Sequence, residues 1–143
     1  QHWESLTVVT NDLAIAQVLT PVMGIYVILL GGHIDVESNS TCGVLATNMV
    51  QTMHFDICFL GTQAITPDWR IMTANAEKID VKRACLQASD KVVLIADHSK
   101  FKKHKLYYIF DIWEVDTLIS DYTATSEEQG LFDEHQVHFI HVQ

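Results

Sequence analysis

The sequence predicts an α/β domain with a Rossmann-like, mostly parallel sheet and helices on both faces. Short apolar runs of strand length alternate along the chain with segments of helical period. The apolar runs at residues 27–30, 57–60 and 92–96 are also continuous, which is typical of strands covered on both sides. With 143 residues, of which 48% are hydrophobic, we expect a single domain spanning residues 1–143.

The expected elements follow one another in chain order. Strands are expected at residues 6–9, 25–30, 55–60, 91–96, 106–110, 117–119 and 137–142. Helices are expected at residues 12–19, 43–53, 75–88 and 126–135. In the first helix, Leu13, Ala16 and Val18 are expected to point inward. The segment 31–42 and the segment after Gly61 are expected to be loops.

The charge of the chain limits its partners. Eighteen acidic residues against nine Lys and Arg give a formal net charge of −9. Because nucleic-acid backbones bind through a surplus of cationic side chains, we expect no DNA or RNA binding by this segment itself. A small anionic ligand remains open, since a few local cations and backbone N–H groups suffice for one phosphate.

Several features favour a cytoplasmic protein. Cys42, Cys58 and Cys85 are odd in number and widely spaced, which suits buried thiols in a reducing compartment. The longest apolar stretch, residues 24–30, is too short to span a bilayer, and the first five residues do not resemble a signal peptide. We therefore expect no membrane partner. Because the chain does not begin with Met, we also expect it to be a piece of a longer protein.

Glycines and polar residues directly follow four of the expected strands. They are Thr10, Asn11, Gly31, Gly32, Gly61, Asp97 and Lys100. Because ligands of open parallel sheets bind beyond the carboxyl ends of the strands, these residues are expected to converge on one binding site. Each also has a purely structural interpretation. The glycines suit turns, Thr10, Asn11 and Asp97 suit caps, and Lys100 suits a solvated surface.

A series of short motifs runs from about residue 6 to residue 121. In chain order they are Thr10-Asn11, Gly31-Gly32, S-x-x-x-x-G at 38–43, F-D-x-x-F-x-G at 55–61, T-x-x-x-x-K at 73–78, V-K-R at 81–83, D-x-S-K-F at 97–101 and D-x-L-I-S-D at 116–121. The most specific of them is D-x-S-K-F after an apolar strand. The series resembles the C-terminal domain of DeoR-type transcriptional repressors.

This resemblance implies both a fold and a function. The fold is that of ribose-5-phosphate isomerase and glucosamine-6-phosphate deaminase. The function is to bind a phosphorylated sugar and thereby control DNA binding by a separate N-terminal helix-turn-helix domain. Thr10, Asn11, Gly31, Gly32 and the backbone around Gly61 would line the pocket. Asp97 would bond to sugar hydroxyls and Lys100 to the phosphate. Lys78 and Lys82 also match the family pattern, with their role left open. We expect a homo-oligomer without a cofactor.

Two departures from the family pattern bear on this interpretation. The first strand and phosphate-binding loop of the family would precede Gln1, so we expect an N-terminally truncated domain whose exposed sheet favours association with another copy or with another molecule. The loop after Gly61 carries only Asp68 where related isomerases carry catalytic carboxylates. We therefore expect no catalytic residue and no enzyme activity. A sugar-phosphate isomerase or deaminase of the same fold is the alternative.

The histidines near the C-terminus invite the hypothesis of a metal site. His135, His138 and His141 recur at every third position. In a strand, however, an odd separation points side chains to opposite faces, and the sequence contains no H-E-x-x-H or C-x-x-C spacing. We therefore expect no metal site. A bare interaction module is a further alternative, for which no particular residue argues.

Overall fold

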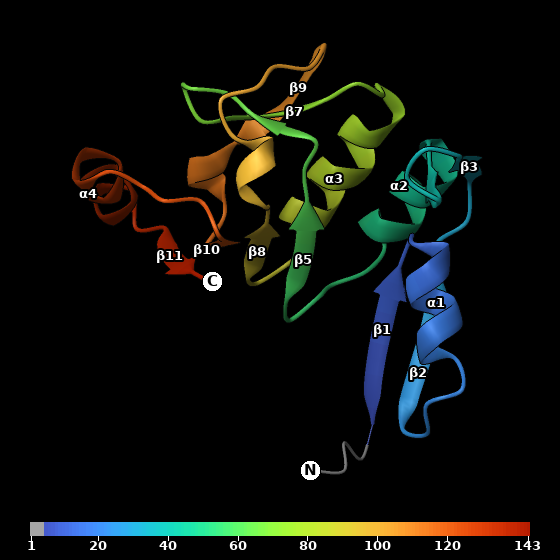
Figure 1. Ribbon diagram of the computed structural model, residues 1–143. Coiled ribbons are helices and arrows are strands. Elements are labelled where there is room, and N and C mark those ends of the chain that lie inside the picture. The colour runs from blue at the N-terminus through green and yellow to red at the C-terminus, as the bar shows by residue number, and fades with distance from the viewer. Residues whose placement is uncertain (1–4) are drawn as a thin grey trace.

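The computed structural model describes residues 5–143 and confirms the α/β class (Figure 1). Its central sheet has four parallel strands in the order β11–β10–β8–β5. They are β5 (Cys58–Gly61), β8 (Val92–Ile95), β10 (Thr117–Ser120) and β11 (His138–His141). All four correspond to predicted strands. The strand predicted at 55–60 begins at Cys58, because Phe55 forms an isolated bridge to Ser89 instead of a ladder.

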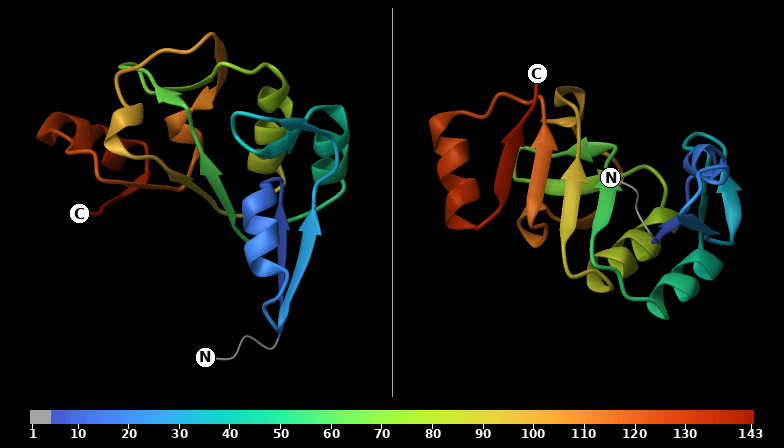
Figure 2. Two further views of the ribbon diagram at one scale, coloured as in Figure 1. Left: turned by 45° about the vertical axis from the view of Figure 1, so that its right-hand side comes forward. Right: turned by 90° about the horizontal axis from the view of Figure 1, so that it is seen from below.

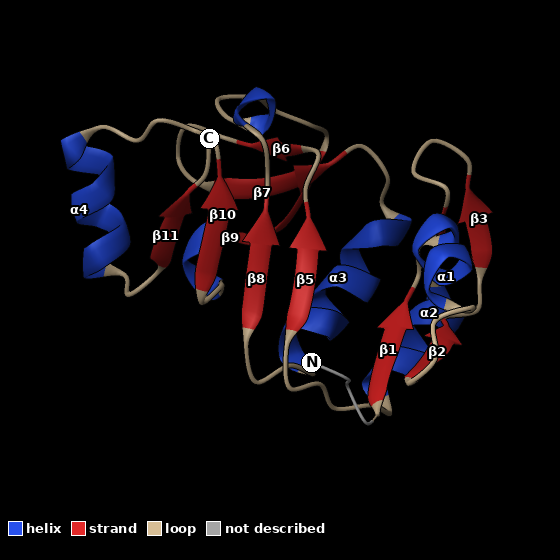
Figure 3. Ribbon diagram, turned by 60° about the horizontal axis from the view of Figure 1, so that its bottom comes forward, coloured by secondary structure: helices blue, strands red, loops and turns tan. Residues whose placement is uncertain are grey.

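A second parallel sheet contains two strands, β1 (Leu6–Thr10) and β2 (Ile25–Leu29), joined by the helix α1 (Leu13–Leu19). The predicted strands at 6–9 and 25–30 are thus confirmed. Within residues 5–143, no backbone ladder joins this pair to the central sheet. Figures 2 and 3 show β1 and β5 at the adjoining sides of the two sheets, with the helix α3 (Glu77–Gln87) behind them.

Two segments predicted as loops contain short strands. In 31–42, β3 (His33–Asp35) and β4 (Ser40–Cys42) form an antiparallel hairpin. After β5, β6 (Ala64–Ile65) pairs with β7 (Arg70–Thr73), which pairs in turn with β9 (Tyr107–Asp111). The loop predictions are therefore wrong. β3, β4 and β6 have only two or three residues, which are too few to show a period, and β7 finds its partner β9 only in the folded chain.

Four helices match the four predicted ones. Besides α1 and α3 they are α2 (Val44–Gln51) and α4 (Ser126–Glu134), and two 3₁₀ turns occur as η1 (His98–Lys100) and η2 (Ile112–Glu114). Ala16 of α1 is buried as predicted. Val18 is 69% exposed, so its predicted inward position is wrong, because α1 covers only a narrow two-stranded sheet. None of the helices within residues 5–143 is both long and apolar enough to cross a membrane.

The main core lies on one face of the central sheet. The strand register places Leu60, Leu94, Leu118 and Phe139 in one row, and the three leucines are buried against residues of β7 and β9. The opposite face is covered unevenly, since Val93 is buried whereas Phe59 is 60% exposed and Ile95 is 48% exposed. A continuous apolar run therefore predicts these strands correctly but overstates their burial.

A smaller core lies between β1–β2 and the helices α2 and α3. Its buried residues are Leu30, Ala46, Val50, Val81 and Ala84. The helix α1 packs on the other face of β1 and β2, so this sheet has helices on both faces (Figure 2). On α3, Val81 and Ala84 belong to the smaller core, while Ile79 and Leu86 pack against the main core. The helix α3 therefore connects the two parts of the molecule.

Candidate functional site

The N-terminal half of α3 carries two lysines to the carboxyl ends of both sheets. The Lys78 ammonium lies 2.6 Å from an Asp35 carboxylate oxygen of β3, in the hairpin that follows β2. The Lys82 ammonium donates a hydrogen bond of 2.6 Å to the carbonyl oxygen of Gly61, the last residue of β5. Cationic groups thus lie where ligands of open parallel sheets bind, although the chain as a whole is acidic.

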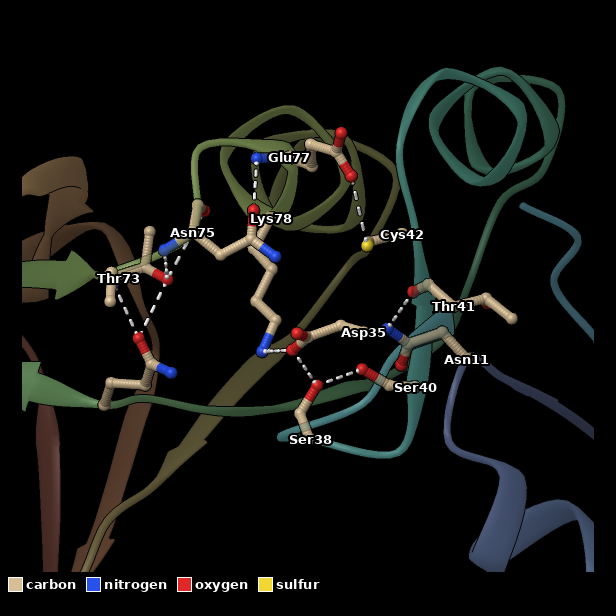
Figure 4. A network of polar contacts seen from close by, with 12 residues as sticks. Asn11, Asp35, Ser38, Ser40, Thr41, Cys42, Thr73, Asn75, Glu77 and Lys78 are labelled. Atoms are coloured by element: carbon tan, nitrogen blue, oxygen red, sulfur yellow. Dashed lines mark hydrogen bonds and ion pairs between the residues drawn. The ribbon is translucent and has the colours of Figure 1, made fainter. Parts of the chain in front are cut away.

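The ion pair between Lys78 and Asp35 is buried and belongs to a larger network (Figure 4). The two side chains are only 10% and 16% exposed. The Ser38 hydroxyl donates to Asp35 at 2.5 Å and contacts the Ser40 hydroxyl at 2.6 Å. The hydrogen bonds from Lys78 and then from Ser38 lower the pKa of Asp35, so its carboxylate is ionised. This network fixes the β3–β4 hairpin to the start of α3.

Lys82 lies in a different environment from Lys78. Burial, followed by repulsion from Lys78, lowers the pKa of Lys82 to about 8. Within residues 5–143, no carboxylate forms a salt bridge with this ammonium, which is bonded to the neutral Gly61 carbonyl. A phosphate at this position would supply the missing negative charge and a stronger, charge-assisted hydrogen bond.

Thr10 and Asn11 lie where β1 meets β4. The Asn11 side chain donates to the Thr41 carbonyl oxygen at 2.9 Å, and the Asn11 carbonyl accepts from the Thr41 amide at 2.8 Å. The Thr10 hydroxyl accepts a hydrogen bond from the Asp12 amide at 3.1 Å. The Thr10 side chain therefore holds the turn between β1 and α1 in place, and Asn11 attaches the hairpin to the end of β1.

Gly31 and Gly32 connect β2 to the hairpin at the same edge as Asn11. Gly32 has a φ of +131°, and a Cβ atom there would lie 2.4 Å from the Cys42 carbonyl oxygen. Glycine is therefore required at this position by both conformation and space. The Gly31 amide contacts the Met49 sulfur of α2 at 3.2 Å. The structure thus brings Thr10, Asn11, Gly31 and Gly32 together at the end of β1–β2.

Gly61, Asp97 and Lys100 form a separate group at the end of the central sheet. Gly61 pairs with Ile95 in the register of β5 and β8, so Asp97 follows at the same sheet edge. Asp97 caps the turn η1 by accepting from the Ser99 amide at 2.8 Å, and hydrogen bonding from the Ser99 side chain and then from this amide lowers the pKa of Asp97. Lys100 is the last residue of η1 and is partly exposed. Within residues 5–143, Asp97 makes no hydrogen bond to Thr10, Asn11, Gly31 or Gly32.

Asp68, the carboxylate nearest to the position of the isomerase bases, is already engaged. It accepts a hydrogen bond of 2.5 Å from the Thr66 hydroxyl and lies 3.2 Å from the Arg70 side chain. These contacts, led by the Thr66 hydrogen bond, lower the pKa of Asp68. A general base needs a pKa near the working pH, so this carboxylate is poorly suited to proton abstraction.

Sequence reasoning missed Asp35, Ser40 and Glu77 as members of this region. The reason is that the β3–β4 hairpin was expected to be a loop, so its side chains had no assigned direction. Lys78 could have indicated a buried carboxylate in this region, because a lysine within the apolar pattern of a helix needs an anion nearby. In the segment after Gly61, the Gln63 side chain accepts hydrogen bonds from the Thr73 hydroxyl at 3.0 Å and from the Ala74 amide at 2.7 Å. It therefore holds the segment that precedes α3.

The C-terminal histidines are dispersed in the structure. His138 and His141 lie on β11, while the His135 ring stacks on Trp113 at a centroid distance of 4.2 Å. Around β11 and α4 lies an open hollow of about 540 Å³ whose lining includes His138 and His141. None of the predicted site residues lines this hollow. Among the described residues, the side chains that gather metal-ligating atoms are instead His33, Cys42 and Glu77.

Comparison with known proteins identifies a matching family of sensor domains and several related transcriptional regulators. The model of the family described as "DeoR C terminal sensor domain" matches residues 1–122. The chain is 31% identical to the HTH-type transcriptional repressor GlcR of Bacillus subtilis over 94% of this chain and 52% of that protein. It is 30% identical to the HTH-type transcriptional regulator GolR of Listeria innocua, over 81% of this chain and 46% of that protein. It is 28% identical to the glycerol-3-phosphate regulon repressor of Escherichia coli, over 92% of this chain and 52% of that protein.

These matches cover only part of each relative. The chain spans about half the length of the curated relatives it matches. The relatives are named as transcriptional regulators, and the matched family is named for a sensor domain at the C-terminus. From the extent of the family match over residues 1–122, the chain belongs to the DeoR C-terminal sensor domain family.

Proposed function

We propose that this domain binds a phosphorylated sugar and thereby controls DNA binding by a helix-turn-helix domain elsewhere in the full-length protein. The observation that carries the proposal is the Lys82 ammonium at the carboxyl end of β5, bonded to the Gly61 carbonyl without a carboxylate partner among the described residues. Lys100 follows the neighbouring strand β8 and would supply a second cation. The names of the relatives support a regulatory role.

The proposed pocket uses the residues that the sequence predicted, together with Lys82. Thr10, Asn11, Gly31 and Gly32 would approach the ligand from the end of β1–β2. Gly61, Asp97 and Lys100 would approach it from the end of the central sheet. Asp97 would accept hydrogen bonds from sugar hydroxyls, and the lysines would bind the phosphate. A sugar phosphate bound between the two groups would make contacts to both of them.

Binding would act as an allosteric signal if it favoured one arrangement of the full-length protein. We infer that this arrangement involves a homo-oligomer, because Phe59 and Ile95 expose apolar surface on the central sheet. A DNA-binding regulator of this kind would act in the cytoplasm. Because Asp68 is engaged by Thr66 and Arg70, we propose that the domain is not an enzyme. Turnover of ribose 5-phosphate by the full-length protein would contradict that part.

The test compares sugar phosphates with the same sugars lacking phosphate, by calorimetric titration of the full-length protein. We expect Lys82→Met and Lys100→Ala to weaken binding of the phosphorylated sugar by about 1.5–3 kcal/mol each and to leave the weak binding of the free sugar unchanged. Lys91→Ala is the matched control, since Lys91 is an exposed lysine at the opposite end of β8. Equal affinity of wild type and both variants for the phosphorylated sugar would remove the two lysines from the site.

A second measurement connects binding to regulation. The affinity of the full-length protein for its operator DNA is expected to change when the phosphorylated sugar is added, and to change less in Lys82→Met. An operator affinity that no sugar phosphate alters would contradict the sensing role.

A further inference from the structure

Three side chains with metal-ligating atoms meet at the start of α3. They are His33 of β3, Cys42 of β4 and Glu77 of α3, and their donor atoms all lie within 4.8 Å of one another. The Cys42 sulfur lies 3.6 Å from His33 Nε2 and 3.6 Å from a Glu77 carboxylate oxygen (Figure 4 shows Cys42 and Glu77). The His33 ring and the Glu77 carboxylate contact each other directly.

The fold holds these three side chains together through several independent constraints. His33 and Cys42 are direct partners in the antiparallel register of the hairpin. Gly43 has a φ of +91°, and a Cβ atom there would lie 3.3 Å from the His33 ring, so glycine leaves the space that the ring occupies. The buried pair of Lys78 with Asp35 attaches the residue after Glu77 to the same hairpin. The position of all three donors is thus determined by backbone pairing and a buried ion pair.

The spacing of the donors agrees with a tetrahedral ion. With about 2.3 Å from zinc to sulfur and about 2.0–2.2 Å to nitrogen or oxygen, ligands around Zn²⁺ are about 3.6 Å apart when one is sulfur. Both distances from Cys42 have this value. The His33 and Glu77 side chains are 58% and 48% exposed, so they have room to separate and receive an ion between them. Cys42 is fully buried and would form the fixed base of the site.

We propose that His33, Cys42 and Glu77 bind one divalent transition-metal ion of the Zn²⁺ type. Imidazole, thiolate and carboxylate are the three donor types that zinc takes in proteins, and three protein ligands leave a fourth position for water or another ligand. On binding, the Cys42 thiol loses its proton to solvent and a metal–sulfur bond forms. The ion would link both strands of the hairpin to α3, next to Gly31 and Gly32. This proposal does not depend on the sugar-phosphate function.

The test uses Co²⁺ as a spectroscopic probe and Zn²⁺ in competition with a chromophoric chelator, on the full-length protein purified without metal. We expect one Co²⁺ per chain, a thiolate-to-cobalt charge-transfer band, and loss of the band when Zn²⁺ is added. Glu77→Gln and His33→Ala are expected to weaken Zn²⁺ binding at least tenfold, because each removes one ligand. Both side chains are half-exposed, so these variants are expected to fold, which circular dichroism checks.

Two controls make the assignment specific. Cys42→Ser is expected to abolish the charge-transfer band, whereas Cys58→Ser and Cys85→Ser are expected to keep it, although those two thiols also lie close together. His54→Ala is the matched histidine control, since His54 is exposed and pairs with Asp90 far from the hairpin in sequence. Absence of a band in the wild type, or a band that persists in Cys42→Ser and disappears in Cys58→Ser, would overturn the proposal.

Discussion

The two parallel sheets of this molecule contain equally apolar strands but differ greatly in burial. In the central sheet, Leu94 and Leu118 are fully buried and stand at the centre of an aromatic and aliphatic core. In the β1–β2 sheet, no residue of either strand is buried, and the adjoining core has five small or medium-sized buried residues. Since stability follows the apolar area removed from water, the two sheets are expected to contribute very unequally.

The difference in burial indicates which part of the molecule a bound ligand can most easily stabilise or shift. The β1–β2 part is attached to the rest of the molecule through α3, whose Val81 and Ala84 belong to the smaller core, and through the ion pair of Lys78 with Asp35. A part held by a small core and a buried ion pair is stabilised or shifted by a few further hydrogen bonds more readily than a large packed apolar core. The proposed sugar-phosphate site and the proposed metal site both lie at this junction.

The largest effect is expected from the core of the central sheet. Leu118→Ala should lower the free energy of unfolding by about 4 kcal/mol, because it opens a cavity in a fully buried site. Val9→Ala, in the half-buried strand β1, should lower it by about 1 kcal/mol. Urea unfolding of both variants measures the comparison. Equal losses would show that the two sheets are stabilised alike.

A slightly smaller effect is expected at the buried pair that joins the two parts. Asp35→Ala should cost about 3 kcal/mol, because it leaves the Lys78 ammonium buried without its anion. The double variant Asp35→Ala/Lys78→Met should regain much of that loss, since it removes both charges and keeps the apolar stem of the lysine. Asp68→Ala is the control, as the Asp68–Arg70 pair is exposed and should change unfolding little. A double variant as unstable as Asp35→Ala would show that the charges are not the cause.

The smallest effect concerns an exposed pair at the end of the central sheet. His98 Nδ1 lies 2.6 Å from the Asp121 carboxylate, which also accepts from the His98 amide at 2.5 Å. The hydrogen bond raises the pKa of His98 and lowers the pKa of Asp121. The contribution of the pair is complete between the ordinary values of about 3.9 for Asp and about 6.5 for His. It is lost as pH rises through the raised His98 value or falls through the lowered Asp121 value.

An NMR titration of the His98 ring measures this directly. We expect its pKa to fall back toward the ordinary histidine range in Asp121→Asn. No corresponding pH dependence is expected at the end of β1, because Asn11 and Thr41 do not titrate. An unchanged His98 pKa in Asp121→Asn would contradict the assigned cause.

The sequence predicted the helices and the strands with a clear apolar pattern, and it missed the shortest strands. The four helices and the strands β1, β2, β5, β8, β9, β10 and β11 were all expected near their observed positions, because each has enough residues to show its apolar pattern. The strands β3, β4, β6 and β7 were missed. β3, β4 and β6 have only two or three residues and show no period, and β7 depends on a partner more than thirty residues away, in β9. Gly32 was expected in a turn, and the structure adds that a side chain there would meet Cys42.

For the candidate site, too, local sequence patterns predicted some features and tertiary packing determined the others. The order of its motifs in the sequence predicted the DeoR family, and the alternation of elements placed Thr10, Gly31, Gly61 and Asp97 after strands. That much depends on local pattern, which the chain carries residue by residue. Tertiary structure alone decided that Lys78 faces Asp35, that Lys82 faces Gly61, and that His33, Cys42 and Glu77 meet. The contacts of Glu77 and Lys78 depend on how the hairpin and α3 pack across 35 to 45 residues of chain, and the contact of Lys82 with Gly61 spans 21 residues. Such packing, unlike a period, leaves no local trace in the sequence.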